Sequence, residues 1–350
     1  MNKISDTVSL CEHCYRHVPA TKFERDNEIW LGKTCPKHRY SEHLVEPNAE
    51  FYLNYEYPRF GHRAYFIEVT NRCNLTCPHC YQEPDNSTTD LPIDYILEQI
   101  KSWPDDGYAI SLAGAEPTVR KDLDVLIEKI QALPGKPRQL IVLTNGVKLS
   151  KEDYVKKFTK FTNVVWTVGL NHPDYNGHKV RSKQLKGIAN ANRLGLDLKN
   201  VSYTLEGLHQ LEYCLEEIQR FYPDTCRQFR IRVGADIGRN PEGNQIYLSQ
   251  LVSATKKIAM EKNWTVEEDP GHSIRAHCAL IINGVFVKLI QWPDATTLDL
   301  EEVQTETWAD LLPGKPISPL VHQVLLRDAS VNNKMMLFDT VPEKYRRGND

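Results

Sequence analysis

Three cysteines stand close together in the segment Cys73-Asn-Leu-Thr-Cys77-Pro-His-Cys80. Thiolates are the protein ligands that hold iron–sulfur clusters. A cluster held by three thiolates keeps one iron open to a small molecule, and no obvious fourth cysteine accompanies this triplet. The spacing therefore predicts a cluster with one open iron. The alternatives are three incidental thiols or a zinc site, in which His79 would be the fourth ligand that structural zinc normally takes.

A second set of ligands lies near the N-terminus, as two pairs with two residues between the partners of each. Cys11 and Cys14 form the first pair, and Cys35 and His38 the second. Three sulfurs and one nitrogen make a tetrahedral site, for which zinc is the default metal and iron the alternative. The segment is too short to bury a core of its own, so we expect the metal to be structural.

From Ala64 onward, short apolar runs alternate with amphipathic stretches. The runs predict strands at Tyr65–Val69, Ala109–Leu112, Leu140–Leu143, Val164–Val168, Val201–Thr204 and Arg230–Val233. The amphipathic stretches predict helices at Ile93–Trp103, Lys121–Leu133, Lys151–Lys160, Ser182–Leu194, Gly207–Tyr222 and Leu248–Asn263, with Asp90 and Ser150 as N-caps. Strand–helix alternation favours an α/β fold with a parallel sheet, and six units are fewer than the eight of a closed barrel. We therefore expect a partial (β/α)6 barrel of the TIM type.

Four parts of the chain are expected. Residues 1–50 form a small metal-binding subdomain, residues 51–63 an aromatic connector, residues 64–278 the partial barrel, and residues 279–350 a C-terminal extension. The extension should begin with a β-hairpin, because Asn283-Gly284 stands between two apolar runs.

Polar residues follow several of the predicted strands, where ligands gather in parallel α/β folds. The second strand ends in Gly114-Ala115-Glu116-Pro117, the third in Thr144-Asn145-Gly146 and the fourth in Gly169-Leu170-Asn171. On the sixth strand, alternation places Arg230 and Arg232 on one face. An arginine inside the barrel would need a charged partner, such as a carboxylate or an anionic substrate; an outward ion pair is the alternative.

The Cys-x3-Cys-x2-Cys spacing at the end of the first strand resembles the signature of the radical S-adenosylmethionine (SAM) superfamily. The resemblance implies that Cys73, Cys77 and Cys80 hold a [4Fe–4S] cluster whose open iron chelates SAM. It also implies reductive cleavage of SAM to a 5′-deoxyadenosyl radical, which abstracts hydrogen from a substrate. Other residues would contact SAM: His79 at the adenine, Gly114, Ala115 and Glu116 at the methionine amine as a Gly-Gly-Glu-Pro element, Asn145, Val168 and Asn171 on the nucleoside side, and Arg232 at the carboxylate.

The N-terminal motif, with its ligand pairs Cys11–Cys14 and Cys35–His38, resembles that of one branch of the superfamily. This branch includes archaeal dihydropterin methylases and tetraether lipid synthases. Many of these relatives have Cys-Pro-x-His-Gly at the second ligand pair, where this chain has Arg39. The branch implies methylation or carbon–carbon bond formation. Relatives often carry more cysteines for further clusters, whereas this chain retains three: Cys214, Cys226 and Cys278. We expect these to be core residues, with Cys278 as the best candidate for an auxiliary cluster.

Composition narrows the function classes. The 43 Lys and Arg against 46 Asp and Glu give a net charge of −3, which argues against general nucleic-acid binding. No apolar run approaches the roughly 20 residues of a membrane-spanning helix, and no signal peptide is evident, so we expect a cytoplasmic protein. The expected partners are SAM, an unidentified small-molecule, lipid or peptide substrate, and an external one-electron reductant. The alternative is a non-catalytic iron–sulfur or zinc-ribbon protein that transfers electrons or binds other proteins. The sequence identifies no catalytic residue beyond the cofactor ligands.

Overall fold

The structure, a computed structural model, describes residues 1–11, 13, 17–54, 64–77, 80, 84–101, 109–135, 137, 139–170, 172–221, 226, 228–233, 246–270 and 277–291. These residues fall into two compact units. The first unit draws on Met1–Gly61, Leu205–Gln219 and Ile231–Asn332. The second draws on His62–Thr204, Arg220–Arg230 and Asn333–Asp350.

The N-terminal part of the first unit is an antiparallel sheet of four strands in chain order. The strands are β1 (Asn2–Leu10), β2 (His17–Arg25), β3 (Glu28–Cys35) and β4 (Arg39–Glu46). Asp26 and Asn27 turn β2 into β3 with φ of 55° and 63°, a left-handed pair that matches the twist of a two-residue hairpin. The sequence prediction of a small metal-binding knuckle or ribbon over residues 1–50 gave no bounds for these strands.

Buried apolar side chains stabilise this sheet, and two clusters of them lie among the described residues. One consists of Cys11, Val18 and Cys35. The other packs Ile29 of β3 against Tyr52 of α1 (Ala49–Leu53). Phe23 of β2 and Leu31 of β3 are buried as well.

The rest of the first unit packs helices against a second group of strands. The strand order is β11-β12-β13-β10, and β12 and β13 form the hairpin expected around Asn283-Gly284. Alternate residues of β13 are buried, as in a strand with one face against the core. The elements that lie wholly or partly in this unit are α7 (Leu211–Phe221), β10 (Gln228–Val233), α8 (Leu248–Glu261), β11 (Val266–Glu268), β12 (His277–Ile282) and β13 (Val285–Ile290), with η3 (Leu208–Gln210) before α7.

The second unit is built on five parallel strands in the order β9-β8-β7-β6-β5. They are β5 (Ala64–Thr70), β6 (Ala109–Gly114), β7 (Gln139–Thr144), β8 (Val164–Gly169) and β9 (Asp197–Leu205). Residues Val164 to Val168 of β8 are all buried, the pattern of a parallel strand covered on both faces.

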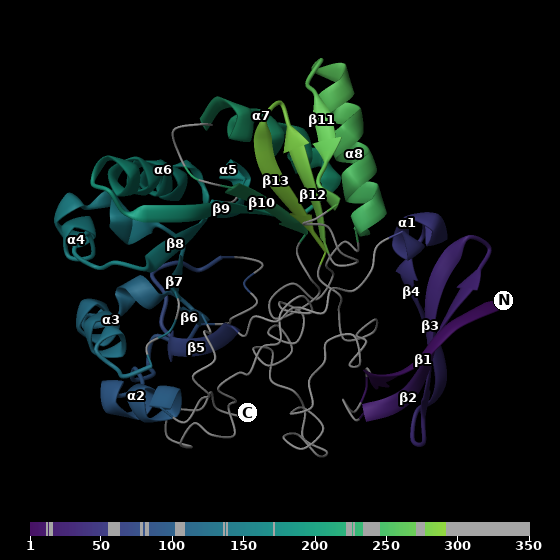
Figure 1. Ribbon diagram of the computed structural model, residues 1–350, viewed down its shortest axis with the longest axis horizontal. Helices are drawn as coiled ribbons and strands as arrows, with labels where there is room; N and C mark the ends of the chain where they lie inside the picture. The colour runs from purple at the N-terminus through teal and green to yellow at the C-terminus, as the bar shows by residue number, and fades with distance from the viewer. Residues whose placement is uncertain are drawn as a thin grey trace. The chain divides into compact units, whose positions relative to one another are not determined.

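Helices lie along the outer side of these strands (Figure 1). They are α2 (Ile93–Lys101), α3 (Leu123–Gln131), α4 (Glu152–Lys156), α5 (Pro173–Asn176) and α6 (His178–Arg193), with η1 (Pro117–Val119) and η2 (Val147–Ser150) between them. The predicted strand–helix alternation is confirmed for all six strands and their helices.

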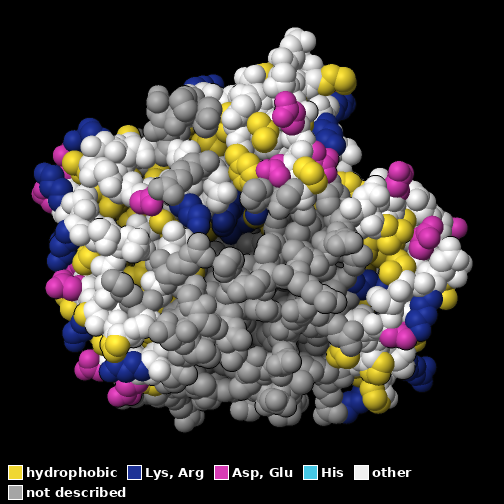
Figure 2. Space-filling view, viewed as in Figure 1, with side chains coloured by type: hydrophobic (Ala, Val, Ile, Leu, Met, Phe, Trp, Pro, Cys, Tyr) yellow, Lys and Arg dark blue, Asp and Glu magenta, His cyan; other side chains and the backbone are white. Residues whose placement is uncertain are grey.

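Charged side chains of both signs alternate on the outer surface of these helices (Figure 2). Several form exposed ion pairs: Lys160 with Glu128 at 3.0 Å and Arg193 with Glu152 at 2.6 Å. Exposed pairs of this kind each contribute about 0–1 kcal/mol. Among the described residues, no helix is long and apolar enough to cross a membrane.

The N-cap prediction for Ser150 was wrong. Ser150 ends η2, and Lys151 precedes the first turn of α4. The Ser150 hydroxyl instead donates to the Val147 carbonyl, 2.7 Å away. Asp90, the other predicted cap, stands three residues before α2, and its carboxylate is bound to Arg72 and Thr70.

Candidate cluster and metal sites

The three cysteines of the triplet lie in one loop between β5 and α2, which we call the cysteine loop (residues 71–92). Cys73, Cys77 and Cys80 are each partly exposed. The Leu75 N–H points at the Cys73 sulfur from 3.3 Å, and the Cys73 N–H donates to Asn86 Oδ1 at 3.0 Å. The loop therefore folds back on itself around its first cysteine.

Neighbouring charges act on the Cys73 thiol. Burial, together with the charges of Glu116, Cys77 and Cys80, raises the pKa of Cys73 to about 12, although the Leu75 N–H opposes the rise. Thiolates that repel one another in this way need a cation to hold them deprotonated, which a cluster or metal supplies. The cysteine loop thus fits the iron–sulfur cluster that its spacing predicts.

The loop also holds an amide without a partner. Neither Nδ2 nor Oδ1 of Asn71 has a hydrogen-bond partner among the described residues, although both atoms are buried. Buried amides normally bond to protein, water or ligand. A polar group or an ordered water beside the loop would satisfy this one.

The turn after β6 approaches the start of the cysteine loop closely. Gly114 has φ of 113°, and a Cβ at this position would overlap the Thr70 carbonyl oxygen. The next N–H, that of Ala115, donates to the same oxygen at 3.0 Å. Glycine is required here by both the backbone angle and the space.

Glu116 is 1% exposed, and its carboxylate accepts four hydrogen bonds. Oε1 accepts from Thr118 N (3.0 Å), Thr118 Oγ1 (2.5 Å) and Thr144 Oγ1 (2.7 Å), and Oε2 accepts from Asn145 N (2.6 Å). Burial raises the pKa of Glu116, and these donors oppose the rise. In this structure Glu116 joins the ends of β6 and β7, and its oxygens are occupied by protein donors.

Asn145, at the end of β7, reaches the cysteine loop. Its Nδ2 donates to Asn74 Oδ1 at 2.8 Å and lies 3.9 Å from the Cys73 sulfur. Its Oδ1 accepts from Val147 N at 3.0 Å. Two residues predicted from separate motifs, Cys73 and Asn145, are thus brought together.

Sequence reasoning missed Gln184. This residue of α6 is 3% exposed, and its Nε2 donates to the carbonyls of Asn145 (2.9 Å) and Gly169 (3.0 Å). It therefore ties together the ends of β7 and β8. A glutamine on the buried face of a predicted helix was the available signal, because buried polar side chains need partners.

The remaining predicted SAM contacts are placed less directly. Val168 is fully buried, with Cγ1 close to where a Cβ on Gly146 would lie (2.7 Å). Arg232 lies on β10 in the first unit, on the face opposite the buried Ile231 and Val233. His79 and Asn171 lie outside the described residues.

The N-terminal ligands converge. The ligand atoms of Cys11, Cys35 and His38 all lie within 4.8 Å of one another, and His38 Nδ1 is 3.3 Å from Cys11 Sγ and 3.5 Å from Cys35 Sγ. Burial opposes ionisation of Cys35, yet hydrogen bonds from the His38 and Lys37 backbone, and then from the Cys11 and His38 side chains, lower its pKa to about 6. Such a thiolate suits zinc. Cys14, the predicted fourth ligand, lies outside the described residues.

The two ligand sets differ in spread. Within the described part of the chain, Cys73, Cys77 and Cys80 do not form a group as tight as the N-terminal one. A four-iron cube separates its cysteines more widely than a single ion does.

The other cysteines sit in packed surroundings. Cys214 on α7 and Cys278 on β12 are both fully buried. Burial raises the pKa of Cys226 to about 12. These environments agree with the expectation that they are core residues.

Comparison with known families matches this division. Residues 67–219 match the Radical SAM superfamily, and residues 3–46 match the HMPTM N-terminal zinc ribbon domain. The chain thus carries a radical SAM domain preceded by a zinc ribbon domain. Proteins of this kind use SAM and an iron–sulfur cluster.

Among curated proteins, the chain is 29% identical over 229 residues to a 7,8-dihydro-6-hydroxymethylpterin dimethyltransferase of Methanocaldococcus jannaschii, covering 55% of this chain and 45% of that one. It is 25% identical over 213 residues to a GTP 3′,8-cyclase of Mannheimia succiniciproducens, covering 58% and 62%. The aligned part therefore spans less than two thirds of either relative.

Solved structures give weaker matches. Streptococcus suis SuiB bound to S-adenosylmethionine aligns with a TM-score of 0.49 and 16% identity, over 72% of this chain and 55% of that one. SuiB bound to its precursor peptide SuiA aligns with a TM-score of 0.45 and 20% identity, over 65% and 55%.

Proposed function

We propose that this protein is a radical SAM enzyme that cleaves SAM reductively and abstracts hydrogen from a substrate. The observation that carries the proposal is the cysteine loop, which holds three partly exposed thiols and whose first cysteine, Cys73, lies 3.9 Å from Asn145 at the end of β7. We propose that Cys73, Cys77 and Cys80 hold a [4Fe–4S] cluster. When bound, the cluster and SAM supply the one-electron chemistry, while the protein binds and orients.

The strand ends beside this loop would receive SAM. The Ala115 N–H donates to the carbonyl of Thr70, just before the cysteine loop, and the Asn145 side chain lies 3.9 Å from the Cys73 sulfur. We assign the methionine end to the Gly114–Glu116 turn, which Glu116 orders through its four hydrogen bonds. The nucleoside end goes to the residues after β7 and β8, including Asn171. His79 beside the adenine and Arg232 at an anionic group complete the proposed contacts.

The scaffold we propose is a partial barrel formed by β5 to β10, with the site at the carboxyl ends of its strands. Its boundaries would be those expected from the sequence, residues 64–278. A partial barrel has an open side that suits a bulky substrate.

For the N-terminal domain we propose one zinc ion held by Cys11, Cys14, Cys35 and His38 in a structural role. The three described ligands converge within 4.8 Å. A structural zinc of this kind contributes folding energy outright.

The relatives support a substrate class. One is named for dimethylation of a dihydropterin and the other for cyclisation of GTP. A reduced pterin and a guanine share a fused bicyclic ring rich in nitrogen. We therefore propose a heterocyclic substrate of this kind, with methylation or carbon–carbon bond formation as the reaction.

The test is anaerobic reconstitution with iron and sulfide, followed by incubation with SAM and dithionite. We expect about four irons per chain, absorbance near roughly 400 nm from sulfide-to-iron charge transfer, and release of 5′-deoxyadenosine. The C73A/C77A/C80A variant should lose all three, whereas a C214A control should keep them. A protein that binds iron but never cleaves SAM would be the non-catalytic electron-transfer or interaction protein instead.

A further inference from the structure

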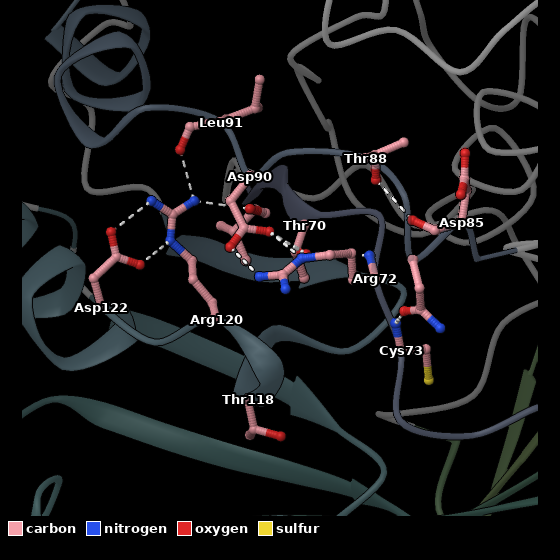
Figure 3. A network of polar contacts seen from close by, with 12 residues as sticks. Thr70, Arg72, Cys73, Asp85, Thr88, Asp90, Leu91, Thr118, Arg120 and Asp122 are labelled. Carbon is pink, nitrogen blue, oxygen red and sulfur yellow. Dashed lines mark hydrogen bonds and ion pairs between the residues drawn. The ribbon is translucent and has the colours of Figure 1, made fainter.

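Two arginines hold the base of the cysteine loop (Figure 3). Arg120, which follows η1, is 2% exposed, and its Nη1 donates to the carbonyls of Val69 (2.9 Å) and Leu91 (2.7 Å). One carbonyl lies at the end of β5 and the other just before α2. Asp122 holds this guanidinium in place, with Oδ1 2.7 Å from Nε. Arg120 thus ties the two ends of the loop together.

Arg72 makes the second connection, within the loop itself. Its Nε and Nη2 donate to the two carboxylate oxygens of Asp90, at 3.1 and 2.5 Å. Thr70 Oγ1 donates to the same carboxylate at 2.6 Å and accepts from the Arg72 N–H at 3.1 Å. These three side chains form a closed ring of hydrogen bonds immediately before Cys73.

The returning part of the loop supports the same segment. The Asp85 N–H donates to the Asn71 carbonyl at 3.0 Å, and the Asn86 side chain accepts from the Cys73 N–H. Asp85 is itself fixed by a tight turn, since its Oδ1 accepts from Ser87 N at 2.8 Å. Residues 70–73 are therefore held on one side by Asp90 and on the other by residues 85–86.

An ion pair on a protein surface usually contributes little. The Arg72–Asp90 pair differs because it is bidentate, half-buried, and shared with a threonine that also bonds to the backbone. Bidentate pairs fix geometry as well as adding energy. Burial raises the pKa of Asp90, but the bonds from Arg72 and Thr70 outweigh it and lower the pKa below its ordinary range. The carboxylate is therefore ionised, as the pair requires.

Resting on the proposed function, we propose that Arg72 and Asp90 are positioning residues for the cluster. Their ion pair shares hydrogen bonds with Thr70, and Arg120 holds the two ends of the loop together. These contacts fix the backbone of Cys73 before the cluster is inserted. Neither residue needs to touch iron, SAM or substrate. Precise support from surrounding hydrogen bonds is what keeps such ligands in binding geometry.

The test compares Asp90→Asn, Arg72→Lys and the conservative Asp90→Glu with the wild-type chain. The control is Glu152→Gln, which breaks an ion pair of similar length with Arg193 on the outer helices. The first readout is hydrogen–deuterium exchange of peptides covering residues 70–91 in the cluster-free protein. The second is the rate at which a chelator removes iron from the reconstituted protein.

We expect exchange in residues 70–91 to be about tenfold faster in D90N, and iron loss to be several-fold faster, with partial recovery in D90E and no change in E152Q. R72K keeps the positive charge but has one side-chain nitrogen in place of the two that bind Asp90, so its exchange and iron-loss rates should lie between those of wild type and D90N. If D90N fails to fold, R72K provides the test. Exchange and iron loss at wild-type rates in both D90N and R72K would overturn the proposal. A wild-type chain that takes up no cluster would refute the proposed function. The hydrogen–deuterium exchange of the cluster-free protein would still test whether Arg72 and Asp90 position the loop.

Discussion

The side-chain amide of Asn145 lies against the sulfur of Cys73, with Nδ2 3.9 Å from Sγ. The two residues are on different strand–loop connections, and Asn74 Oδ1 holds the amide in place from 2.8 Å. An amide N–H beside a cluster thiolate stabilises the more negative, reduced state. This contact links the end of β7 to the redox behaviour of the proposed cluster.

Replacing Asn145 should therefore lower the reduction potential of the cluster. Asn145→Asp exchanges the N–H donor for a carboxylate oxygen, so we expect a larger decrease than in Asn145→Ala. Redox titration of the reconstituted protein, followed by electron paramagnetic resonance, measures it. Asn192→Ala at the C-terminal end of α6 serves as the control and should leave the potential unchanged. An unchanged or higher potential in N145D would contradict this role.

Gly114→Ala should disrupt the start of the cysteine loop. The new Cβ would overlap the Thr70 carbonyl, and φ of 113° is unfavourable for alanine. We expect a loss of about 2 kcal/mol or more in unfolding free energy, together with lower iron content. Gly195→Ala is the matched control: φ is 80° there, but no atom lies within 4 Å of the added Cβ. Thermal unfolding and iron analysis of the two variants compare strain alone with strain plus overlap, and equal effects would refute the close approach.

The thiol of Cys73 should be unreactive at neutral pH in the cluster-free protein. Burial raises the pKa of Cys73 to about 12, so only a small fraction of the thiol is ionised to the reactive thiolate at neutral pH. As the pH rises toward the pKa, that fraction increases tenfold with each pH unit. We expect its alkylation by iodoacetamide to be about 100-fold faster at pH 9.5 than at pH 7.5. Mass spectrometry of the peptide measures the rate. A rate that levels off near pH 8.5, like that of an ordinary cysteine, would show that Cys73 is not desolvated.

Much of the second unit could be predicted from sequence because its strands and helices have clear periodicity. Apolar runs such as Val164–Val168 become fully buried parallel strands, and their ends carry the polar residues of the site. The bounds of the four N-terminal strands could not be predicted, because a strand such as β4 does not alternate between buried and exposed residues: only its last residue is buried. Asp90 looked like a helix cap, since sequence alone does not show that Arg72 lies within reach. For Gln184, its place on the predicted helix indicated a buried polar side chain, but the sequence did not show that its two carbonyl partners come from distant strand ends.

Arg39 stands where the resembling family often has glycine, and its backbone is left-handed. Many proteins with this ligand pair have glycine after the histidine, and Arg39 adopts φ of 68°, a left-handed conformation that glycine adopts without strain. Arg39→Gly should stabilise the chain by a few tenths to about 1 kcal/mol, since relief of strain exceeds the added chain entropy. Arg39→Ala, which keeps a Cβ, should give no such gain. Calorimetry of the zinc-loaded proteins measures both, and equal melting temperatures for R39G and R39A would contradict the strain.

The open iron of a three-thiolate cluster is the central claim, and its most direct test is the response of the reduced cluster to SAM. Electron paramagnetic resonance spectra of the reconstituted, reduced protein should be recorded with and without SAM. Binding of SAM to an iron of the cluster predicts a changed spectrum, and no cluster signal at all in C73A/C77A/C80A. A cluster whose spectrum is identical with and without SAM, or one that survives loss of the three cysteines, would contradict the account.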